Sequence, residues 1–446
     1  MQGRHRLIIA SNRGPFSFSA SLDGRIETKR GVGGLVTAVM GGLHGVESAW
    51  LSVAMSEDDR VMAASGQEVT HPEMPGVTNI LLPTSADGFR LYYGEASNRL
   101  LWFAMHGLPL PDLADEAWDA YRAVNERMAG LIAARAAQDA RVLVQDYHLA
   151  LVPRLLASSR PDLRIGVTWH IPFPTSQRWS ATPIAGEVME GLAAARFVNF
   201  HSSRWADRYR AAGGTNAQVR ALGVDPVDLA QARRDPTVAA HADEIREWAG
   251  DRCLIVRADR IDPAKGITLG IRGFAAALTE LGTTEVRHLM RLTPSRMDIP
   301  EYAHELAAIE ALVADLSPPD QEAVVRSEVT DDRARTFGAL MEADVILITS
   351  LADGMNLVAR EGPLLNRRDA ALVLSKNTGA HDELGEAALV IDPAELEQIA
   401  AAITQACRMD DQERRRRAAR LRSLAPGTSP DVWLREQFEE LAGEPA

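Results

Sequence analysis

The sequence predicts an α/β protein of two domains, each built on a parallel β-sheet with helices on both faces. The chain has 446 residues, more than one hydrophobic core usually serves, so two domains of roughly 200 residues each are expected. Hydrophobic residues make up 46% and charged residues 24% of the chain, which is typical of a folded globular protein. Short apolar runs also alternate with longer segments of helical period, as in doubly wound sheets.

The apolar runs form two series along the chain, and each run ends in polar or glycine-bearing residues. The first series comprises residues 7–10, 142–144 and 165–169. The second comprises residues 254–257, 288–292, 345–349, 371–374 and 389–391. Their length and their content of Val, Ile and Leu predict buried parallel strands.

Two segments between these runs have the apolar spacing of amphipathic helices. In residues 265–281 the apolar side chains recur at spacings of four, three and four, at Ile267, Ile271, Phe274 and Leu278. In residues 394–408 they recur at Leu396, Ile399 and Ile403. Each pattern predicts one buried stripe facing a sheet.

The domain boundary is placed at the Leu-Gly-Val-Asp-Pro segment of residues 222–226, which a polar stretch follows. Glycine and proline in such a segment are typical of a linker. We therefore expect a first domain over residues 1–225 and a second over residues 226–428. Ser429, Pro430 and Asp431 predict the start of a last helix, and we expect residues 429–446 to cross back to the first domain.

The net charge of −13 opposes nucleic acid as a partner, because it repels polyphosphate backbones. Four consecutive arginines at residues 414–417 follow acidic residues and have no aromatic residue beside them. This favours a solvated helix surface over a nucleic-acid-binding site. Two cysteines in apolar stretches, Cys253 and Cys407, indicate neither a disulfide framework nor a zinc site. No apolar run approaches the roughly 20 residues of a membrane span, so we expect a cytoplasmic protein with no membrane partner.

A basic pair follows the apolar run at residues 254–257, where ligands of open α/β sheets bind. Arg260 and Lys265 lie just before the predicted helix, whose first amides favour an anion. Two cations there suit a diphosphate and require no metal. The same spacing also allows both to pair simply with Asp259 and Asp262 at the surface, and spacing alone does not decide between the two.

A second polar loop follows the run at residues 345–349 and contains Asp353, Gly354, Met355 and Asn356. Glycine lets the backbone approach a ligand, and the amides that open the next helix can bind a second polar group. Asp353 is suited to accept hydrogen bonds from sugar hydroxyls. Glu361, expected about two turns along that helix, is suited to a ribose, although a lone helix carboxylate is usually just exposed.

Polar residues also end the strands of the first half, at Arg13, Asp146 and His170. A lone histidine at a strand end is more often structural than catalytic. The glycine cluster at residues 31–34 is not the G-x-G-x-x-G pattern, which disfavours nicotinamide binding. The sequence contains neither a pair of histidines at helical spacing nor a G-x-S-x-G turn, which disfavours zinc and serine hydrolysis.

The order and spacing of these segments resemble the trehalose-6-phosphate synthase family, retaining glycosyltransferases of two Rossmann-like domains facing across a cleft (the GT-B type). The segments in question are Ser11-Asn12-Arg13, Gly33-Gly34-Leu35-Val36, Tyr93, Trp102, Asp146-Tyr147-His148, His170 to Pro174, Arg260, Lys265, Ser295-Arg296, residues 353–358 and Glu361. They extend over most of the chain, and their joint order is much more specific than any one of them.

The resemblance implies a role for each matching residue. The implied donor site comprises Gly33, Gly34, His170, Arg260, Lys265, Asp353, Gly354, Met355, Asn356, Leu357, Val358 and Glu361. Arg260 and Lys265 would hold the diphosphate, Glu361 the ribose, and His170 with Asp353 the glucose, while Asp146 would contact the acceptor sugar. Arg13, Tyr93, Trp102 and Arg296 would surround the 6-phosphate of the acceptor, a role that suits arginine because it binds phosphate in a bidentate manner.

The implied reaction transfers glucose from GDP- or UDP-glucose to glucose 6-phosphate and gives α,α-trehalose 6-phosphate with retention of configuration. Arg260, Lys265, Asp146 and His170 would be its catalytic residues, and stabilisation of the departing diphosphate would be the main catalytic effect. We expect no metal and no cofactor. The expected partners are the sugar nucleotide and the sugar phosphate, with a homo-oligomer possible.

Some residues depart from the family pattern, namely Val53, Gly107, Ala352 and the displaced Pro294. They leave the acceptor and the nucleotide base open, and some relatives use GDP-glucose. Residues 56–60 and 366–370 are also similar to those of pseudo-glycosyltransferases related to validoxylamine 7'-phosphate synthase, which couple cyclitols. A different class of function on the same fold is a sugar-phosphate sensor without catalysis.

Overall fold

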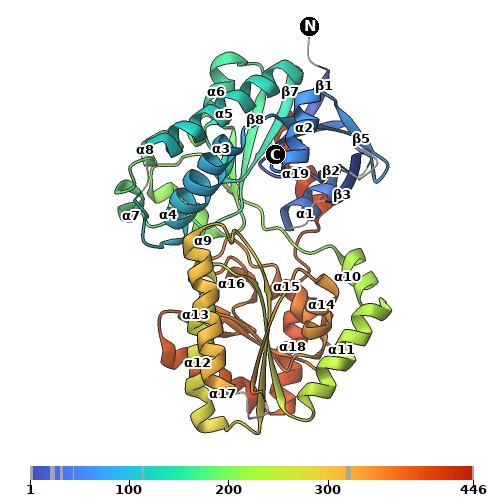
Figure 1. The fold of residues 1–446 in the computed structure, drawn as a ribbon, viewed down its shortest axis with the longest axis vertical. Coiled ribbons are helices and arrows are strands. Elements are labelled where there is room, and N and C mark those ends of the chain that lie inside the picture. The colour runs from blue at the N-terminus through green and yellow to red at the C-terminus, as the bar shows by residue number, and fades with distance from the viewer. Residues whose placement is uncertain are drawn as a thin grey trace. The chain divides into compact units, whose positions relative to one another are not determined.

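The computed structural model describes residues 4–20, 26–30, 34–43, 45–112, 115–317 and 323–443. The chain divides into two compact units (Figure 1), which we call the first and the second unit. The first unit comprises Met1–Leu222 with Pro430–Ala446, and the second comprises Gly223–Ser429. The boundary therefore lies at Leu222, three residues before the expected position, and the last helix belongs to the first unit.

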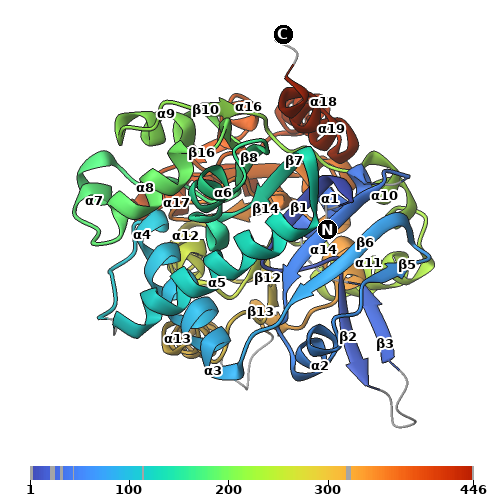
Figure 2. The same cartoon turned by 90° about the horizontal axis from the view of Figure 1, so that it is seen from above.

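The first unit contains an eight-stranded sheet in the order β10-β9-β8-β7-β1-β4-β6-β5. Its strands are β1 (His5–Ser11), β4 (Ser48–Val53), β5 (Val69–His71), β6 (Met74–Leu82), β7 (Ala136–Gln145), β8 (Arg164–Trp169), β9 (Phe197–Phe200) and β10 (Ala217–Val219). All pair in parallel except β5, which runs antiparallel to β6. Figure 2 shows β8, β7 and β1 in this order across the sheet, with β6 further along beyond β4. A separate antiparallel hairpin joins β2 (Phe16–Ala20) and β3 (Ile26–Arg30).

Helices cover this sheet on both faces. They are α1 (Gly34–Gly42), α2 (Glu57–Ser65), α3 (Ala86–Phe89), α4 (Trp102–His106), α5 (Asp115–Arg135), α6 (Val152–Ser159), α7 (Ser176–Ser180), α8 (Ala185–Ala193), α9 (Ser203–Ala211) and α19 (Pro430–Ala442), with the π-helix η1 (Arg90–Leu101) and the 3-10 turn η2 (Tyr147–Leu149). Helix α5 contacts β1 and β6, whereas α19 contacts β7, β8 and α1. Trp433, Leu434 and Phe438 of α19 are buried in one hydrophobic cluster with Val39 and Leu43 of the α1 region.

The second unit contains a six-stranded parallel sheet in the order β13-β12-β11-β14-β15-β16. Its strands are β11 (Cys253–Arg260), β12 (Val286–Thr293), β13 (Val325–Val329), β14 (Val345–Ile348), β15 (Ala371–Ser375) and β16 (Leu389–Ile391). Five of these six strands coincide with predicted apolar runs, and the predicted α/β class with two parallel-sheet domains is confirmed. The sixth strand, β13, was not predicted, since Val-Arg-Ser-Glu-Val has too little apolar character.

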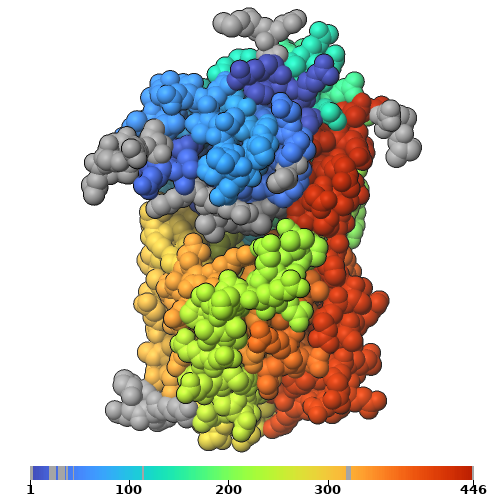
Figure 3. Space-filling model, turned by 90° about the vertical axis from the view of Figure 1, so that its right-hand side faces the viewer, coloured from blue at the N-terminus to red at the C-terminus, as the bar shows by residue number. Residues whose placement is uncertain are grey.

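Helices also flank the second sheet. They are α10 (Pro226–Ala232), α11 (Pro236–Ala249), α12 (Ile267–Leu281), α13 (Pro300–Leu316), α14 (Arg333–Glu342), α15 (Val358–Leu365), α16 (His381–Leu384), α17 (Leu396–Cys407) and α18 (Asp411–Leu424), with the 3-10 turn η3 (Pro263–Lys265). Figure 3 shows α10 and α11, in yellow-green, along one face of this unit. Helix α11 packs on α14.

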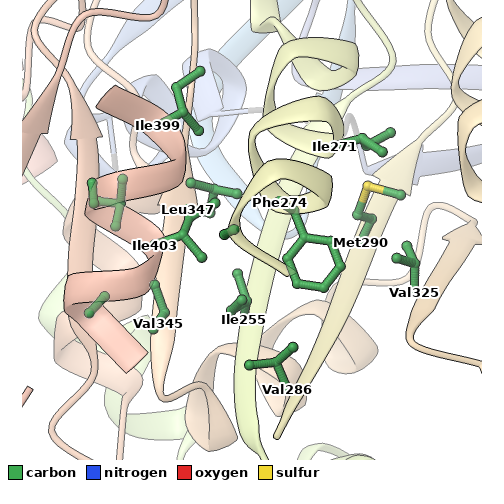
Figure 4. Packing of buried hydrophobic residues seen from close by; sticks show 14 of the residues in the cluster. Ile255, Ile271, Phe274, Val286, Met290, Val325, Val345, Leu347, Ile399 and Ile403 are labelled. Atoms are coloured by element: carbon green, nitrogen blue, oxygen red, sulfur yellow. The ribbon is translucent and has the colours of Figure 1, made fainter. Parts of the chain in front are cut away.

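The core of the second unit lies between its sheet and the helices α12 and α17 (Figure 4). Ile271 and Phe274 of α12 are buried on Ile255 of β11, as the apolar stripe predicts. Gly273 permits the close contact of the two helices, because a Cβ there would lie 2.3 Å from Cγ2 of Ile399. Burial of each large side chain contributes about 1.5–3 kcal/mol. Leu396 departs from its predicted stripe, since 39% of it is exposed at the helix start.

The two cysteines of the chain meet at the base of this core. Cys253 opens β11 and Cys407 closes α17, and their Sγ atoms are 2.7 Å apart as free thiols. Their separation of 154 positions in the sequence gave no indication of this contact. The hydrogen bond that the Cys253 thiol donates to Cys407 is the largest cause that raises the pKa of Cys253, and burial raises it further.

Candidate active site

The second sheet has its topological switch point at β11, which lies between β12 and β14. Ligands of open α/β sheets bind at this point, beyond the carboxyl ends of the strands. Arg260 is the last residue of β11, and Lys265 ends the 3-10 turn that follows. Asp353 lies in the loop after β14. The fold therefore brings the basic pair and the acidic loop to one edge of one sheet.

Lys265 is held between two carboxylates. Its Nζ lies 2.6 Å from Oδ2 of Asp353 and 3.3 Å from Oδ1 of Asp259. Burial lowers the pKa of the Lys265 amine, but the charges of Asp353 and Asp259 outweigh it and the net pKa is raised. The simple pairing considered for Lys265 is thus partly right, since Asp259 is a partner. The lysine side chain is only 14% exposed, however, and Asp353 is its nearer partner. Arg260 is exposed.

The fully buried Arg257 stabilises the turn that carries Lys265. The guanidinium of Arg257 lies 2.9 Å from Asp259, and it donates to the backbone oxygen of Lys265 at 2.5 Å and to Oγ1 of Thr349 at 2.6 Å. Thr349 in turn donates to the backbone oxygen of Gly266 at 2.7 Å. Gly266 has a φ of 60°, and a Cβ there would lie 2.4 Å from the oxygen of Thr349. Only glycine fits this close turn.

The acidic loop is fixed by its own side chains. Asn356, with a φ of 72°, donates through Nδ2 to Oδ2 of Asp353 at 3.0 Å and accepts from the amide of Ala359 at 3.0 Å. Met355 is buried, with its Sδ 3.4 Å from Nε of the buried Arg360. Leu357 is the N-cap of α15. The loop therefore presents Asp353 and the first amides of α15 at the same edge.

Glu361 lies in the first turn of α15, because that helix begins only at Val358. The expected position two turns along the helix is wrong, since the residues between Asp353 and Leu357 form a loop. Burial raises the pKa of the Glu361 carboxyl, with Arg333 opposing and Asp228 adding to this shift. Within the described residues, its carboxylate accepts no hydrogen bond.

Of the four residues predicted to surround the 6-phosphate of the acceptor, Arg296 lies in the second unit. It has a φ of 52°, and its Nη1 lies 2.7 Å from the hydroxyl of Tyr302 and 3.3 Å from Oδ2 of Asp262. Five described non-glycine residues have a positive φ, and they are Asp139, Asp146, Arg296, Asn356 and Asp369. Such conformations are strained and gather at functional sites. Three of the five are residues that the sequence singles out.

The first sheet has the corresponding switch point at β1, between β7 and β4. Arg13, Asp146 and His170 follow β1, β7 and β8 at their carboxyl ends. Arg13 is exposed, and its backbone oxygen accepts from Oγ of Ser11 at 2.7 Å. Asp146 has a φ of 69°, and its Oδ1 accepts from the amides of Tyr147 at 3.0 Å and His170 at 3.3 Å.

His170 forms hydrogen bonds through both ring nitrogens. Its Nε2 lies 2.8 Å from Oε1 of Gln145, and its Nδ1 lies 2.9 Å from Nε2 of His201. Burial lowers the pKa of His170 well below its ordinary value, and His201 lowers it further. Sequence reasoning missed His201. No local pattern links it to His170, because the two meet only where the parallel strands β8 and β9 end side by side.

Tyr93 and Trp102 lie on consecutive helical segments of the first unit. The ring of Tyr93 stacks on His148 at a centroid distance of 5.7 Å, and that of Trp102 stacks on His106 at 3.9 Å. Tyr93 belongs to the π-helix η1 of 12 residues, a form that is rare and often functional. Asn98 joins this helix to the Asp-Tyr-His segment, since it donates to the oxygen of Tyr93 at 2.8 Å and accepts from the hydroxyl of Tyr147 at 2.6 Å.

Of the predicted glycines, Gly33 lies outside the described residues and Gly34 opens α1. Within the described ranges, the side chains of His, Cys, Asp and Glu form no group of three suited to a metal ion. The described helices include none whose length and apolar content suffice to cross a membrane. The basic run lies on α18, where Arg416 pairs with Glu413, Arg420 with Glu386 and Arg422 with Asp369.

Comparison with known proteins identifies the relatives of this chain. The model of glycosyltransferase family 20 matches residues 5–212 and 210–443. Trehalose-6-phosphate synthase of Mycolicibacterium vanbaalenii is 34% identical, with 98% of this chain and 96% of the relative covered. The same enzyme of Mycobacterium avium is 33% identical, with 99% and 96% covered.

Solved structures agree with this match at the level of the fold. An α,α-trehalose-phosphate synthase (UDP-forming) from Burkholderia xenovorans in complex with glucose-6-phosphate has a TM-score of 0.83 at 24% identity, with 98% of this chain and 100% of the other covered. A trehalose-6-phosphate protein from E. coli bound with UDP-2-fluoro glucose has a TM-score of 0.85 at 24% identity, with 99% of both chains covered.

Proposed function

This chain belongs to glycosyltransferase family 20 and is a hexosyltransferase, and we propose that it makes α,α-trehalose 6-phosphate. The donor in this proposal is a nucleoside diphosphate glucose, GDP- or UDP-glucose, and the acceptor is glucose 6-phosphate. Glucose is transferred with retention of configuration. Relatives that are 33–34% identical are trehalose-6-phosphate synthases, and related folds bind UDP-2-fluoro glucose or glucose-6-phosphate.

The observation that carries the proposal is the convergence of Arg260, Lys265 and Asp353 at the switch point of the second sheet. Two cations beside the start of α12 suit the diphosphate of the donor. Asp353 and the first amides of α15 suit the hydroxyls of its glucose, and Glu361 suits its ribose. Because Asp353 neutralises Lys265 at 2.6 Å, the lysine is already in place for the phosphate oxygens before the donor arrives.

Transfer breaks the bond between the anomeric carbon of glucose and the diphosphate oxygen, and the acceptor hydroxyl bonds to that carbon on the same face. The proton of that hydroxyl passes to the departing diphosphate. Arg260 and Lys265 stabilise the charge that develops on the leaving group, an effect of about 2.7–4 kcal/mol for one such donor. The chemistry requires neither a metal nor a cofactor.

The first unit supplies the acceptor residues in this proposal. Asp146 would accept from a hydroxyl of the acceptor sugar, and His170 would bind the glucose that is transferred. Arg13, Tyr93 and Trp102 of this unit, with Arg296 of the second, would bind the 6-phosphate. Arginine guanidinium groups bind phosphate in a bidentate manner, and a phenol and an indole add oriented donors.

A donor panel tests the proposal. The chain is incubated with glucose 6-phosphate and UDP-, GDP- or ADP-glucose, and the products are identified by mass spectrometry and by the NMR couplings of the anomeric protons. We expect a disaccharide phosphate in which both anomeric carbons have the α configuration from at least one donor, and much less product from free glucose. Absence of any disaccharide phosphate would refute the proposal. Product from a GDP-linked cyclitol but not from GDP-glucose would replace it with cyclitol coupling.

A further inference from the structure

A chain of hydrogen bonds in the first unit begins at a backbone amide and ends at a side-chain amide. The amide N–H of Leu222 donates to Nδ1 of His201 at 3.3 Å. Nε2 of His201 lies 2.9 Å from Nδ1 of His170, and Nε2 of His170 lies 2.8 Å from Oε1 of Gln145. The four groups thus form one continuous relay, which we call the histidine relay.

The backbone end fixes the direction of every hydrogen bond in the relay. An amide of the main chain can only donate, so Nδ1 of His201 must accept and its proton lies on Nε2. The Nε2–H group of His201 then donates to Nδ1 of His170. The ring proton of His170 therefore lies on Nε2 of His170. Gln145 must therefore present its oxygen rather than its amide nitrogen.

The surroundings favour neutral rings in the relay. Gln145 is fully buried and His201 is 4% exposed, and burial disfavours the charged form of an imidazole. The indole of Trp433 from α19 lies beside both rings in a tilted arrangement, at centroid distances of 5.9 Å from His170 and 6.0 Å from His201. The side-chain carboxylate of Asp146 accepts from the backbone amide of His170.

The orientation of Gln145 has a cost that the relay explains. With Oε1 turned to His170, Nε2 of Gln145 is buried and has no hydrogen-bond partner among the described residues. A buried donor without a partner is destabilising. A simple structural glutamine would turn the amide to satisfy that donor, so the observed orientation indicates that the proton on His170 determines it.

We propose that His201 is a positioning residue for glycosyl transfer, which holds His170 as a neutral ring with its proton on Nε2. The inference rests on the proposed function for the role of His170. A sugar oxygen that reaches His170 then meets an N–H donor of fixed direction at Nε2, which it shares with Oε1 of Gln145. Without His201, Nδ1 of His170 loses its donor, so the proton can move to Nδ1 and the ring can turn.

The protonation state of His170 is measured first, by NMR of the full chain labelled with ¹⁵N-histidine and assigned with a His170→Gln variant. In the unaltered chain we expect His170 to be protonated at Nε2 alone. In His201→Leu, which removes the donor at similar volume, we expect a mixture of the two tautomers. In His201→Gln, whose side-chain amide can still donate to Nδ1, we expect the Nε2 form again.

Kinetics with the donor sugar then link the tautomer to the reaction. We expect kcat/KM for the sugar nucleotide to fall by about 10- to 100-fold in His201→Leu, the scale of a misplaced reacting geometry, and to recover to within about threefold in His201→Gln. The exposed His304 provides a matched control, since His304→Leu should change neither quantity. In a His170→Gln background, His201→Leu should have no further effect on kcat/KM, because it acts through His170.

The outcomes separate the relay from the proposed function. If the double variant shows the product of the two losses of kcat/KM measured in the single variants, His201 acts independently of His170. That result would overturn the inference. So would an unaltered chain in which His170 carries its proton on Nδ1, a result that is decisive even if His201→Leu does not fold. A chain that makes no disaccharide phosphate but shows the expected tautomers would refute the proposed function alone.

Discussion

The two units share a doubly wound sheet with candidate residues at its switch point, but they hold those residues by different interactions. In the second unit Lys265 lies between Asp259 and Asp353, and Arg296 lies against Asp262. In the first unit the side chain of His170 makes neutral hydrogen bonds to His201 and Gln145. The aromatic residues there are stacked on histidines.

This difference matches the ligands that each unit is proposed to bind. A diphosphate brings negative charge, so cations must be available yet stable without it, and neighbouring carboxylates achieve this. A sugar ring brings hydroxyls, for which a neutral donor of fixed direction is more useful than a charge. One topology therefore serves two kinds of recognition, because the loops after the strands carry the chemistry.

The largest expected difference between the units concerns stability. Lys265→Met leaves Asp353 and Asp259 facing each other with little solvent, so we expect the free energy of unfolding to fall by about 3 kcal/mol. Asp146→Asn in the first unit should change it by less than about 1 kcal/mol, since asparagine still accepts from both amides and tolerates a positive φ. Urea denaturation of the two variants measures both values. Equal losses would contradict the comparison.

The catalytic effect of the charge at Arg260 is of similar size. We expect Arg260→Ala to reduce kcat by about 10²- to 10³-fold, because one donor to the leaving group is lost. Its unfolding free energy should hardly change, because the side chain is exposed. Steady-state assays with the sugar nucleotide measure the loss, and the exposed Arg234 of the same unit provides the control Arg234→Ala. Near-normal turnover in Arg260→Ala would exclude the assigned role.

A buried histidine of the second unit should make the fold sensitive to acid. Burial is the main cause that lowers the pKa of His288 from 6.5 to about 4. Because the unfolded chain binds this proton first, stability is complete above pH 6.5 and falls as the pH decreases towards 4, by about 3 kcal/mol. His288→Met should lack this part of the decrease. Denaturation curves of both proteins between pH 4 and 7 give the difference, and parallel curves would exclude His288 as the cause.

The smallest expected effect concerns Glu361, where one substitution should change stability and donor binding in opposite directions. Burial raises the pKa of this carboxyl, so the charged form destabilises the fold as the pH rises through that pKa. We expect Glu361→Gln to raise the melting temperature at pH 7 while weakening donor binding by about tenfold, through a lost hydrogen bond to a charged group. Calorimetry with the nucleoside diphosphate measures the binding. A variant that is both less stable and equally good at binding would contradict the ribose assignment.

Strands with continuous apolar runs could be predicted from the sequence, because burial on both faces favours Val, Ile and Leu in them. The same reasoning located the loops after β11 and β14, hence Arg260, Lys265 and Asp353. It failed for β13, whose Arg326, Ser327 and Glu328 interrupt the apolar pattern. It also missed the π-helix η1, since no spacing of apolar residues is specific for that form.

Within the candidate site, contacts between distant segments could not be predicted. His201 and Leu222 are brought to His170 only by the pairing of parallel strands. The buried support of Lys265 by Arg257 likewise depends on which face of β11 points inwards. Spacing identified the groups that carry charge, whereas the fold alone determines which neighbour neutralises or orients each of them.

The return of α19 to the first unit affects the order in which the protein can fold during its synthesis. Trp433, Leu434 and Phe438 complete the hydrophobic cluster of the first unit, yet they follow all of Gly223–Ser429 in the chain. On the ribosome, where domains generally fold as units, the second unit can close its core while the first still lacks a helix. The N-terminal half of the polypeptide is thus the last to become fully native.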